Sequence, residues 1–256
     1  MSLKLFLVAF TCVGATALWA ANPGVIAPGA KVEKVSGAFE FTEGPAVDRR
    51  GNIYFTDQPN DRIMKWDHTD GSIATFLHPA GRANGLYFDR HGDLIACADE
   101  KNELWSISPA GKVTVLVKKF QGKLLNGPND AWVRPDQGIY FTDPYYKRPY
   151  WNRGPAEQGG EHVYFLAKDR QTLSRVADDL KQPNGIIGTP DGKKLYVADI
   201  GAGKTYDYEI KPDGSLAHKH LFCSLGSDGM TIDHRGNVYL TGKGVTVFNS
   251  DRKSVV

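Results

Sequence analysis

Apolar and polar positions follow one short pattern that occurs five times along the chain. Each copy has a short apolar segment, a turn rich in Asp, Pro, Gly and Asn, and then a β-branched and aromatic run. This order predicts a β-hairpin in every copy. The five copies are TEGPAVDRRGNIYFTD (42–57), ANGLYFDRHGDLIACAD (83–99), PNDAWVRPDQGIYFTD (128–143), PNGIIGTPDGKKLYVAD (183–199) and SDGMTIDHRGNVYLTG (227–242).

Further strand-like runs follow the hairpins and bring each unit to about four strands, the composition of a propeller blade. Examples are Arg62–Trp66 with Ile73–Leu77, and Leu104–Ile107 with Val113–Val117. Successive copies are offset by 41, 45, 55 and 44 residues, within or near the spacing of propeller blades. No stretch of ten or more residues after the N-terminal region shows helical periodicity. The pattern predicts an all-β propeller, with residues 22–256 as a single domain.

The longest offset has a visible source in the third unit. Between Tyr145 and Glu161 the chain is rich in aromatic residues, Pro and Gly, which interrupts the strand rhythm. We expect an inserted loop here. Long loops in compact domains are often lids or binding loops, and a surface excursion without such a role is the alternative.

The number of blades admits two interpretations. By the blade spacing, a sixth copy would begin about 40–55 residues after Asp228, whereas the sequence ends at Val256. The first interpretation is a five-unit ring closed by Lys31–Ser36, which has the pattern of a strand. The second is a propeller of the six-bladed type with its last blade missing or incomplete. The second is favoured because an incomplete fifth unit leaves an unpaired strand edge.

The first 21 residues have the features of a secretory signal peptide. One Lys precedes a run of about 16 mainly apolar residues that ends in small residues, and cleavage is expected after Ala20 or Ala21. The run is short for a spanning helix, so we expect a secreted or periplasmic protein with no stable membrane association after cleavage. A retained anchor is the alternative. Of the cysteines that would remain, Cys97 and Cys223 are expected to be buried free thiols, because they lie in non-adjacent blades.

Composition and motifs argue against several other functions. The net charge is +2 with acids and bases interspersed, which gives no electrostatic case for nucleic-acid binding. The seven histidines are scattered, with no HExxH and no Cys/His cluster, so a zinc site of that kind is not expected. GAGKT (201–205) lacks the first Gly of a phosphate loop, and no GxSxG nucleophile motif is present.

One column of the repeat carries an oxygen-bearing side chain in every copy. Any one Asn-Gly or Asp-Gly pair alone is more often a structural turn. In a propeller, however, equivalent positions of successive blades converge on a ring around the central axis. Two carboxylates and up to three amides on one ring would repel or stay unsatisfied without a cation, and a hard divalent ion such as Ca²⁺ suits oxygen ligands. The column contains Glu43, Asn84, Asn129, Asn184 and Asp228.

Four motifs in this order resemble the gluconolactonase and senescence-marker-protein (regucalcin-like) family of six-bladed propellers. They are FTEGPAVD, NGPNDAWVRPDQGIYFTDP, QPNGI and SDGMTID, and the resemblance runs from about Gly37 onward. Diisopropyl fluorophosphatases and paraoxonases are more distantly similar. The chain departs from the family pattern in lacking a sixth unit. An unstable or inactive product is one interpretation of that departure.

The resemblance implies one central divalent metal, Ca²⁺ or another such as Zn²⁺, Mn²⁺ or Mg²⁺. It implies Glu43, Asn184 and Asp228 as ligands, with Asn129 as a further ligand or as a contact to substrate and metal-bound water. Asp228 would also be the acid/base residue. Asn84 is not one of the usual ligands and is expected to line the substrate site.

The first functional hypothesis is a metal-dependent hydrolase that opens a sugar lactone, a small-molecule substrate. The cation would polarise the ester carbonyl, and Asp228 would assist attack by water. Equally, the metal would acidify its own water while Asp228 only orients it. In the inserted loop, Tyr145, with Tyr146, Tyr150 and Trp151, is expected to stack on a sugar-like ring, and a packing role is the alternative.

Two other functions use the same ring. One is a non-catalytic, metal-stabilised propeller that binds a carbohydrate or a protein, and the other is a phosphotriesterase, which needs the same polarising metal. Glu43 and Asp228 favour a hydrolase, because a structural repeat needs no carboxylates at its axis. The sequence does not indicate an oligomeric state.

Overall fold

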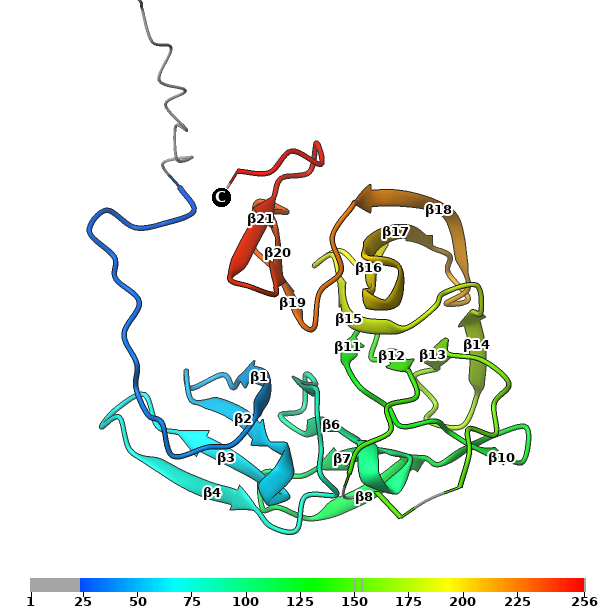
Figure 1. Ribbon diagram of the computed structural model, residues 1–256, viewed down its shortest axis with the longest axis horizontal. Helices are drawn as coiled ribbons and strands as arrows, with labels where there is room; N and C mark the ends of the chain where they lie inside the picture. Colours follow the sequence, from blue (N-terminus) through cyan, green and yellow to red (C-terminus); the bar gives the residue numbers. More distant parts are fainter. Residues whose placement is uncertain (1–23, 150, 153, 256) are drawn as a thin grey trace, which may run out of the picture.

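The strands form five consecutive antiparallel sheets that are arranged around a common centre (Figure 1). The computed structural model describes residues 24–149, 151–152 and 154–255. Within each sheet the strands are neighbours in sequence order, as in propeller blades. The helices in the described residues are single 3₁₀ turns at Gln58–Asn60, Asp99–Lys101 and Ile200–Ala202. The prediction of an all-β propeller is confirmed.

Each blade consists of one repeat copy and the strands that follow it. Blade 1 has β1 (Thr42–Val47), β2 (Ile53–Asp57), β3 (Arg62–Trp66) and β4 (Ile73–Leu77). Blade 2 has β5 (Leu86–Phe88), β6 (Leu94–Ala98), β7 (Glu103–Ile107) and β8 (Val113–Val117), and a small hairpin follows it, β9 (Lys119–Phe120) and β10 (Lys123–Leu124). Blade 3 has β11 (Ala131–Val133), β12 (Ile139–Asp143), β13 (His162–Leu166) and β14 (Leu173–Ala177). Blade 4 has β15 (Pro183–Gly188), β16 (Lys194–Asp199), β17 (Lys204–Ile210) and β18 (Leu216–Cys223), and blade 5 has β19 (Met230–Ile232), β20 (Val238–Thr241) and β21 (Val245–Phe248).

The core lies between the faces of neighbouring blades. β12 and β13 are buried along their whole length, because each lies in the middle of its sheet and both faces are covered. Aromatic side chains reach across the seams: the Tyr140 hydroxyl of blade 3 donates to the Gly214 carbonyl oxygen of blade 4 over 2.8 Å, and the ring centroid of Phe222 in blade 4 lies 5.7 Å from that of Phe248 in blade 5. Each fully buried large apolar side chain contributes about 1.5–3 kcal/mol, so the seams hold the blades in fixed relative positions.

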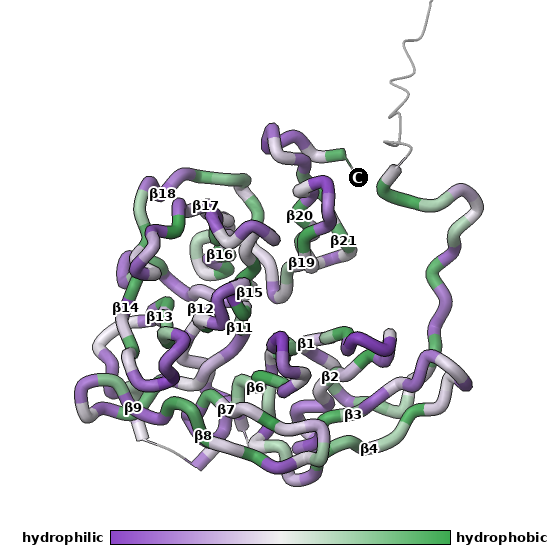
Figure 2. Tube along the Cα trace, turned by 180° about the vertical axis from the view of Figure 1, so that it is seen from behind, coloured by the Kyte–Doolittle hydropathy of each residue, from purple (hydrophilic) through white to green (hydrophobic). Residues whose placement is uncertain are grey.

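One side of the ring is open, between blade 5 and blade 1 (Figure 1). The segment before β1 passes along this side without forming a strand (Figures 1 and 2). The predicted strand at Lys31–Ser36 is therefore wrong: Val32 and Val35 are 104% and 71% exposed, and no neighbouring strand takes up their backbone groups. Alternation of side chains alone does not make a strand where no partner edge is within reach.

The described residues build five blades, not six, and the fifth has three named strands. Beyond β21, Ser254 forms a bridge with Phe248, and the Val255 amide donates to the Val247 carbonyl oxygen over 2.8 Å. The prediction of the six-bladed type is therefore wrong for the described residues, because no sixth sheet follows β21 among them. A ring of five sheets follows from five copies of the hairpin pattern.

The inserted loop of the third unit is present as predicted. The described residues between β12 and β13 form no strand or helix, and Tyr150 lies outside the described residues. Cys97 and Cys223 are buried free thiols, as expected. The predicted signal peptide, residues 1–21, lies outside the described residues. In the part of the chain that the structure describes, no helix is both long and apolar enough to cross a bilayer.

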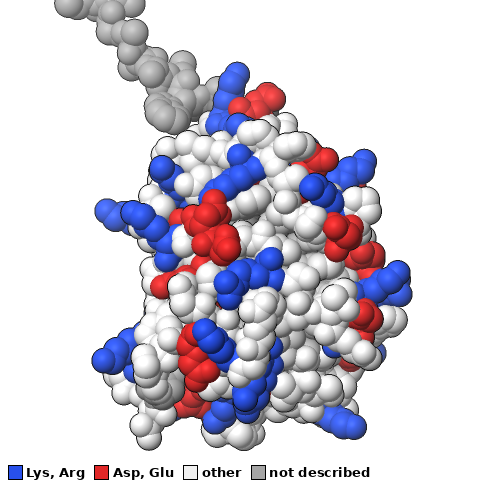
Figure 3. All heavy atoms as spheres, turned by 90° about the vertical axis from the view of Figure 1, so that its right-hand side faces the viewer, with Lys and Arg blue, Asp and Glu red and all other residues white. Residues whose placement is uncertain are grey.

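Acidic and basic side chains are interspersed on the face shown in Figure 3. No large area of only positive or only negative side chains covers that face, which agrees with the small net charge of the whole chain, +2.

Candidate metal and hydrolase site

The five residues of the repeat column lie at the same end of the five innermost strands. Glu43 and Asn184 are within β1 and β15, and the other three come two residues before β5, β11 and β19. The innermost strands of successive blades pack against one another, which brings these positions onto one end of the ring. The three Asn side chains are buried, Glu43 is half-buried and Asp228 is exposed.

Threonine hydroxyls join the backbone of one blade to the next at this end. The Thr56 hydroxyl bonds to the carbonyl oxygens of Glu43 (3.2 Å) and Asn84 (3.1 Å), in blades 1 and 2. The Thr142 hydroxyl of blade 3 donates to the Asn184 carbonyl oxygen of blade 4 over 2.7 Å. Both threonines are fully buried, so these bonds are protected from water and fix the spacing between site residues.

A second repeated residue holds the chain as it enters each blade. Asp143 accepts hydrogen bonds from the backbone amides of Asn126 and Gly127, just before Asn129. The equivalent aspartates, Asp57 and Asp199, bond to the amides at 40–41 and 181–182 in the same way. Together with Asp99, these aspartates end every hairpin copy except the last, and this pattern in the sequence would have revealed them.

Asn184 and Asp228 are in direct contact across the seam between blades 4 and 5. The Asn184 Nδ2 donates to Asp228 Oδ1 over 3.2 Å and to the Tyr146 hydroxyl over 2.7 Å. Tyr146 comes from the inserted loop, and the Arg148 guanidinium carbon lies 4.6 Å from the centroid of its ring. The loop therefore reaches the ring of site residues.

Glu43 also lies within the electrostatic reach of Asp228. Burial raises the pKa of Glu43 to about 7, and repulsion from the Asp228 carboxylate adds to this effect, while Arg148 and the Gly44 amide oppose it. A partly buried carboxyl with a second carboxylate close enough to raise its pKa marks a favourable place for a cation. The sequence prediction that Glu43, Asn184 and Asp228 converge is consistent with these interactions.

Asn129 occupies the same ring with an unsatisfied group. Its side chain is 2% exposed, and its Oδ1 has no hydrogen-bond partner among the described residues. A buried carbonyl oxygen without a partner costs about 1–3 kcal/mol. A cation at the centre of the ring would remove that cost.

The adjacent residue, Asp130, is half-buried, and sequence reasoning did not single out its carboxyl. Its oxygens accept hydrogen bonds from the amides of Ala131 (2.9 Å) and Ile186 (3.0 Å), so it links blades 3 and 4. Burial raises the pKa of Asp130 to about 8, against the effect of these amides, and Glu43 adds repulsion. The other four copies of the repeat have Gly at this position, and that difference was the available signal.

Tyr145, the predicted substrate contact, is oriented differently from Tyr146. Its hydroxyl donates to the Gly154 carbonyl oxygen over 3.2 Å, and its ring lies 6.4 Å from that of Trp151. The hydroxyl of the next residue, Tyr146, instead accepts a hydrogen bond from Asn184, one of the five residues of the repeat column. Asn84 is buried in the ring, at the position expected of a lining residue.

The donor set fits a hard divalent cation. The described residues contain no group of three or more His, Cys, Asp and Glu side chains suited to a metal, because the ring combines only two carboxylates with amides. Carboxylate and amide oxygens are the ligands that Ca²⁺ takes in proteins. The unsatisfied Asn129 oxygen and the Glu43–Asp228 repulsion both agree with such an ion.

Residues 41–256 match the sequence profile of the family described as the SMP-30/Gluconolactonase/LRE-like region. The chain belongs to this family. The resemblance identified from the sequence motifs is thereby confirmed, as is the assignment to a family of gluconolactonase and lactonase-like hydrolases.

The chain is similar to the gluconolactonase of Zymomonas mobilis, with 24% identity over 249 residues. That alignment covers 86% of this chain and 70% of the relative. The lactonohydrolase oryL of Aspergillus oryzae is 27% identical over 182 residues, which cover 60% of this chain and 42% of the relative. The chain thus spans less than half of the fungal enzyme.

Solved structures of the same family superpose closely. A gluconolactonase from Xanthomonas campestris has a TM-score of 0.80 and 30% identity, and the match covers 84% of this chain and 75% of that one. Regucalcin from Agrobacterium tumefaciens, described as a calcium-binding protein, has a TM-score of 0.70 and 19% identity, with 85% and 74% of the two chains covered. The second match supports the propeller fold.

Proposed function

We propose that the chain is a divalent-metal-dependent lactonase that opens a sugar lactone. Its family membership and the names of its relatives support this activity. The observation that carries the proposal is the buried, unpartnered Asn129 Oδ1, which lies on the same ring as the mutually repelling Glu43 and Asp228. This combination supports a cation at the centre of the ring, which the proposed hydrolysis requires.

Glu43, Asn129, Asn184 and Asp228 are the residues that would hold the cation, and Ca²⁺ is the first candidate. Their oxygens are hard donors, and two carboxylates balance a double positive charge. The similar fold of a calcium-binding regucalcin supports the same choice, and Zn²⁺, Mn²⁺ and Mg²⁺ are alternatives. When bound, the ion supplies Lewis-acid polarisation of the lactone carbonyl and stabilises the developing oxyanion.

Asp228 is the residue that moves the proton. It is exposed to solvent, and the Asn184 amide fixes one of its oxygens, so the carboxylate is oriented and accessible to water. The water oxygen bonds to the carbonyl carbon while Asp228 accepts the water proton. The ring C–O ester bond then breaks, and the leaving alkoxide takes the proton to give a hydroxy acid.

The remaining residues would bind and orient the lactone. Asn129 and Asn84 present amides that can bond to its hydroxyl groups. Tyr146 holds Asn184, and the nearby Arg148 is a cation that partly offsets the two carboxylates. We propose that Tyr145, with Trp151 beside it, stacks on the sugar ring and excludes water.

The test is hydrolysis of glucono-lactone by the purified protein. Divalent metal is removed with a chelator, and turnover above the spontaneous rate is measured with and without added Ca²⁺. We expect turnover that depends on the metal. Turnover unaffected by chelation would refute the metal mechanism, whereas metal binding without turnover on any lactone would favour a binding module.

We also propose that residues 1–21 are a signal peptide and that the protein is secreted or periplasmic. The support is the apolar run after Lys4 and the small residues at its end. N-terminal sequencing of the exported protein tests this, and a mature chain that begins with Met1 in the cytoplasm would contradict it.

A further inference from the structure

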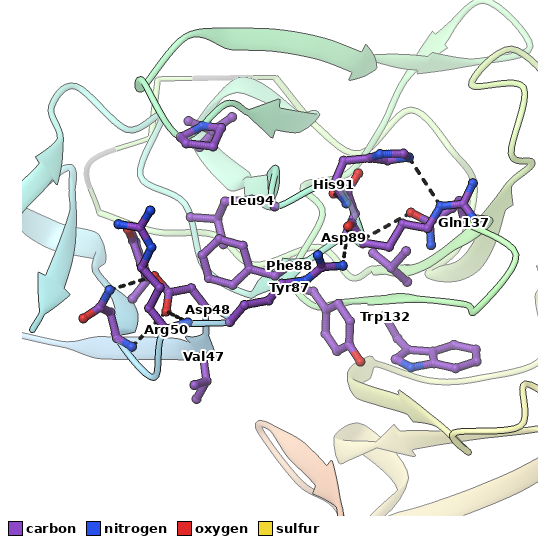
Figure 4. A pocket seen from close by; sticks show the side chains of 18 of the residues that line it. Val47, Asp48, Arg50, Tyr87, Phe88, Asp89, His91, Leu94, Trp132 and Gln137 are labelled. Carbon is purple, nitrogen blue, oxygen red and sulfur yellow. Dashed lines mark hydrogen bonds between the residues drawn. The ribbon is translucent and has the colours of Figure 1, made fainter. Parts of the chain in front are cut away.

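A second concave site lies at the opposite end of the inner strands from Glu43, Asn129 and Asp228. This cavity of about 820 Å³ is lined by the turns that connect the inner strands to the second strands of blades 1 to 4 (Figure 4). Asn84 and Asp89 lie before and after the inner strand of blade 2, β5. At about 3.3 Å per residue, they are about 16 Å apart along the chain, so this cavity is separate from the hydrolase site.

The cavity wall carries an excess of positive charge. Its lining includes five basic side chains and two carboxylates, a formal excess of +3 with His91 neutral. Lys65 and Arg134 have carboxylate partners in Asp67 and Asp136, at 2.9 and 3.6 Å. The other three basic residues form no ion pair with a described residue; they are Arg49, Arg50 and Arg90.

The two carboxylates are used by the turns themselves. Asp48 Oδ1 accepts hydrogen bonds from the amides of Arg50 (2.8 Å) and Asn52 (2.9 Å), and Asp89 Oδ1 does the same for His91 and Asp93. Asp turns of this kind fix the hairpin. Asp48 and Asp89 lie on the same turns as these arginines, but their carboxylates are engaged by backbone amides, and Asp89 also lies 3.6 Å from Arg170. Figure 4 shows Asp48 and Arg50 on one turn at the cavity.

The turns hold one another in position. The Arg49 guanidinium donates to the Arg90 carbonyl oxygen over 2.5 Å, which connects blades 1 and 2. The Arg90 amide donates to Gln137 Oε1 over 3.2 Å, which connects blades 2 and 3. These hydrogen bonds fix the turns of blades 1, 2 and 3 relative to one another, and with them the backbone positions of the basic residues. Because these positions are fixed before binding, an anion is bound with less loss of entropy.

Aromatic rings form the apolar part of the cavity. Tyr54 contacts Phe76 and Phe88 edge to face, with centroids 4.9 and 5.1 Å apart. Tyr87 and Trp132 line the wall beside them (Figure 4). Pockets for small molecules combine such a mostly apolar lining with a few polar groups, and 820 Å³ is within their usual range of about 300–1,000 Å³.

We propose that this cavity is a second ligand site, which binds a small organic anion: a phosphate or carboxylate attached to a planar or apolar ring. The arginines would hold the anionic group through paired, charge-assisted hydrogen bonds. The aromatic rings would cover the ring of the ligand. All lining residues belong to blades 1 to 4, so the site does not depend on the open side of the propeller.

Calorimetric titration with phenyl phosphate at low salt tests the proposal, with benzoate as the carboxylate probe. We expect saturable binding of at least one of them, weaker binding of phenol and inorganic phosphate, and loss of affinity as salt is raised. Phenol has the ring without a charge, and inorganic phosphate has the charge without the ring.

Arg50→Gln and Arg90→Gln should each weaken binding of phenyl phosphate by about tenfold. Arg235→Gln is the matched control, because Arg235 occupies the position of Arg50 in the equivalent turn of blade 5 and does not line the cavity. All three side chains are exposed, so the fold should be retained, which thermal unfolding checks. Arg50→Gln should leave lactone hydrolysis unchanged. Absence of saturable binding by both probes, or equal affinities of the wild type and both cavity variants, would overturn the proposal.

Discussion

The Asn184 amide Nδ2 lies 3.2 Å from Asp228 Oδ1, although 44 residues separate the two along the chain. The bond crosses from blade 4 to blade 5, and it orients a carboxylate that remains open to solvent. An oriented and accessible carboxylate is suited to accept a proton from water. In the proposed mechanism the two residues have separate roles, in which Asn184 positions Asp228 and Asp228 accepts the proton.

Replacement of Asp228 by Asn should remove lactone hydrolysis. The amide cannot accept the water proton, and one ligand charge is lost, so we expect kcat to fall by about 10²–10⁴-fold. The assay is glucono-lactone hydrolysis with Ca²⁺ in excess. Asn84→Ala is the control and should largely retain activity, because Asn84 lines the ring without supplying a carboxylate. Full activity of Asp228→Asn would exclude the proposed role.

Addition of Ca²⁺ to the metal-free protein should raise the temperature of unfolding. Binding to the native state alone stabilises it by about 2.7 kcal/mol when the ion is at 100 times its Kd. Differential scanning calorimetry with and without chelator measures the effect. Asn129→Ala should reduce the rise, because it removes a buried oxygen that has no other partner among the described residues. An equal rise in both proteins would show that Asn129 does not contact the ion.

The stability of the metal-free protein should depend on Glu43 and pH in a defined direction. The pKa of Glu43 is raised from 4.5 to about 7 by burial and by Asp228, with Arg148 opposing, and that of Asp130 is raised to about 8. Between these values and the ordinary ones, the native state binds more protons than the unfolded state. The free energy of unfolding must therefore fall as pH rises through this range.

Glu43→Gln should remove the part of this fall that lies between pH 4.5 and about 7. Urea unfolding in the presence of chelator, at intervals from pH 5 to pH 8, gives the difference between the two proteins. We expect the variant to gain stability relative to the wild type as pH rises. A difference that is constant with pH, or that changes sign in the other direction, would contradict the raised pKa.

Two adjacent tyrosines allow a matched comparison in the inserted loop. Tyr146→Phe removes the hydroxyl that meets Asn184, so the Asn184–Asp228 pair loses one fixed contact. We expect kcat/KM to fall by about three- to tenfold, which corresponds to one hydrogen bond. Tyr145→Phe removes a hydroxyl that bonds to Gly154 and keeps the aromatic ring, so it should change kcat/KM less. A larger fall in kcat/KM for Tyr145→Phe than for Tyr146→Phe would indicate that Tyr145, not Tyr146, contacts the site.

Gly85 is required for the close approach of the inner strands. A Cβ at this position would lie 2.5 Å from Asp130 Oδ1 and 2.6 Å from the Asn129 carbonyl oxygen. Both neighbours are fixed, so Gly85→Ala should cost about 1–3 kcal/mol of stability. Gly242→Ala is the control, since a Cβ there meets nothing within 4 Å. Denaturant unfolding compares the two, and equal stabilities would show that the seam can open without cost.

The repeat allowed the fold and the ring of candidate ligands to be predicted, because hairpin chemistry is local. Strands such as Arg62–Trp66 and Val113–Val117 appear at their predicted limits. The Glu, Asn and Asp column was informative because circular symmetry converts equal positions in a repeat into neighbours in space. The strand predicted at Lys31–Ser36 failed because pairing needs a partner edge, which side-chain alternation does not report.

Two features could not be predicted from the sequence, one in the inserted loop and one in the turns of the repeat. The contact of Tyr146 with Asn184 depends on how an irregular loop folds over the ring, and no period encodes that path. Arg49 and Arg50 have the appearance of ordinary solvated turn residues. Their place in the proposed anion site depends on the turns of three other blades, which only the folded chain brings beside them.

The buried hydroxyls of Thr56 and Thr142 hold main-chain carbonyls of successive site residues, so the side chains at the ring are not needed to maintain its diameter. The atoms that hold neighbouring blades together are therefore different from the atoms that would bind the cation and the substrate. A lineage built on this frame can substitute one amide or carboxylate for another, and explore new substrates, while the scaffold beneath stays intact.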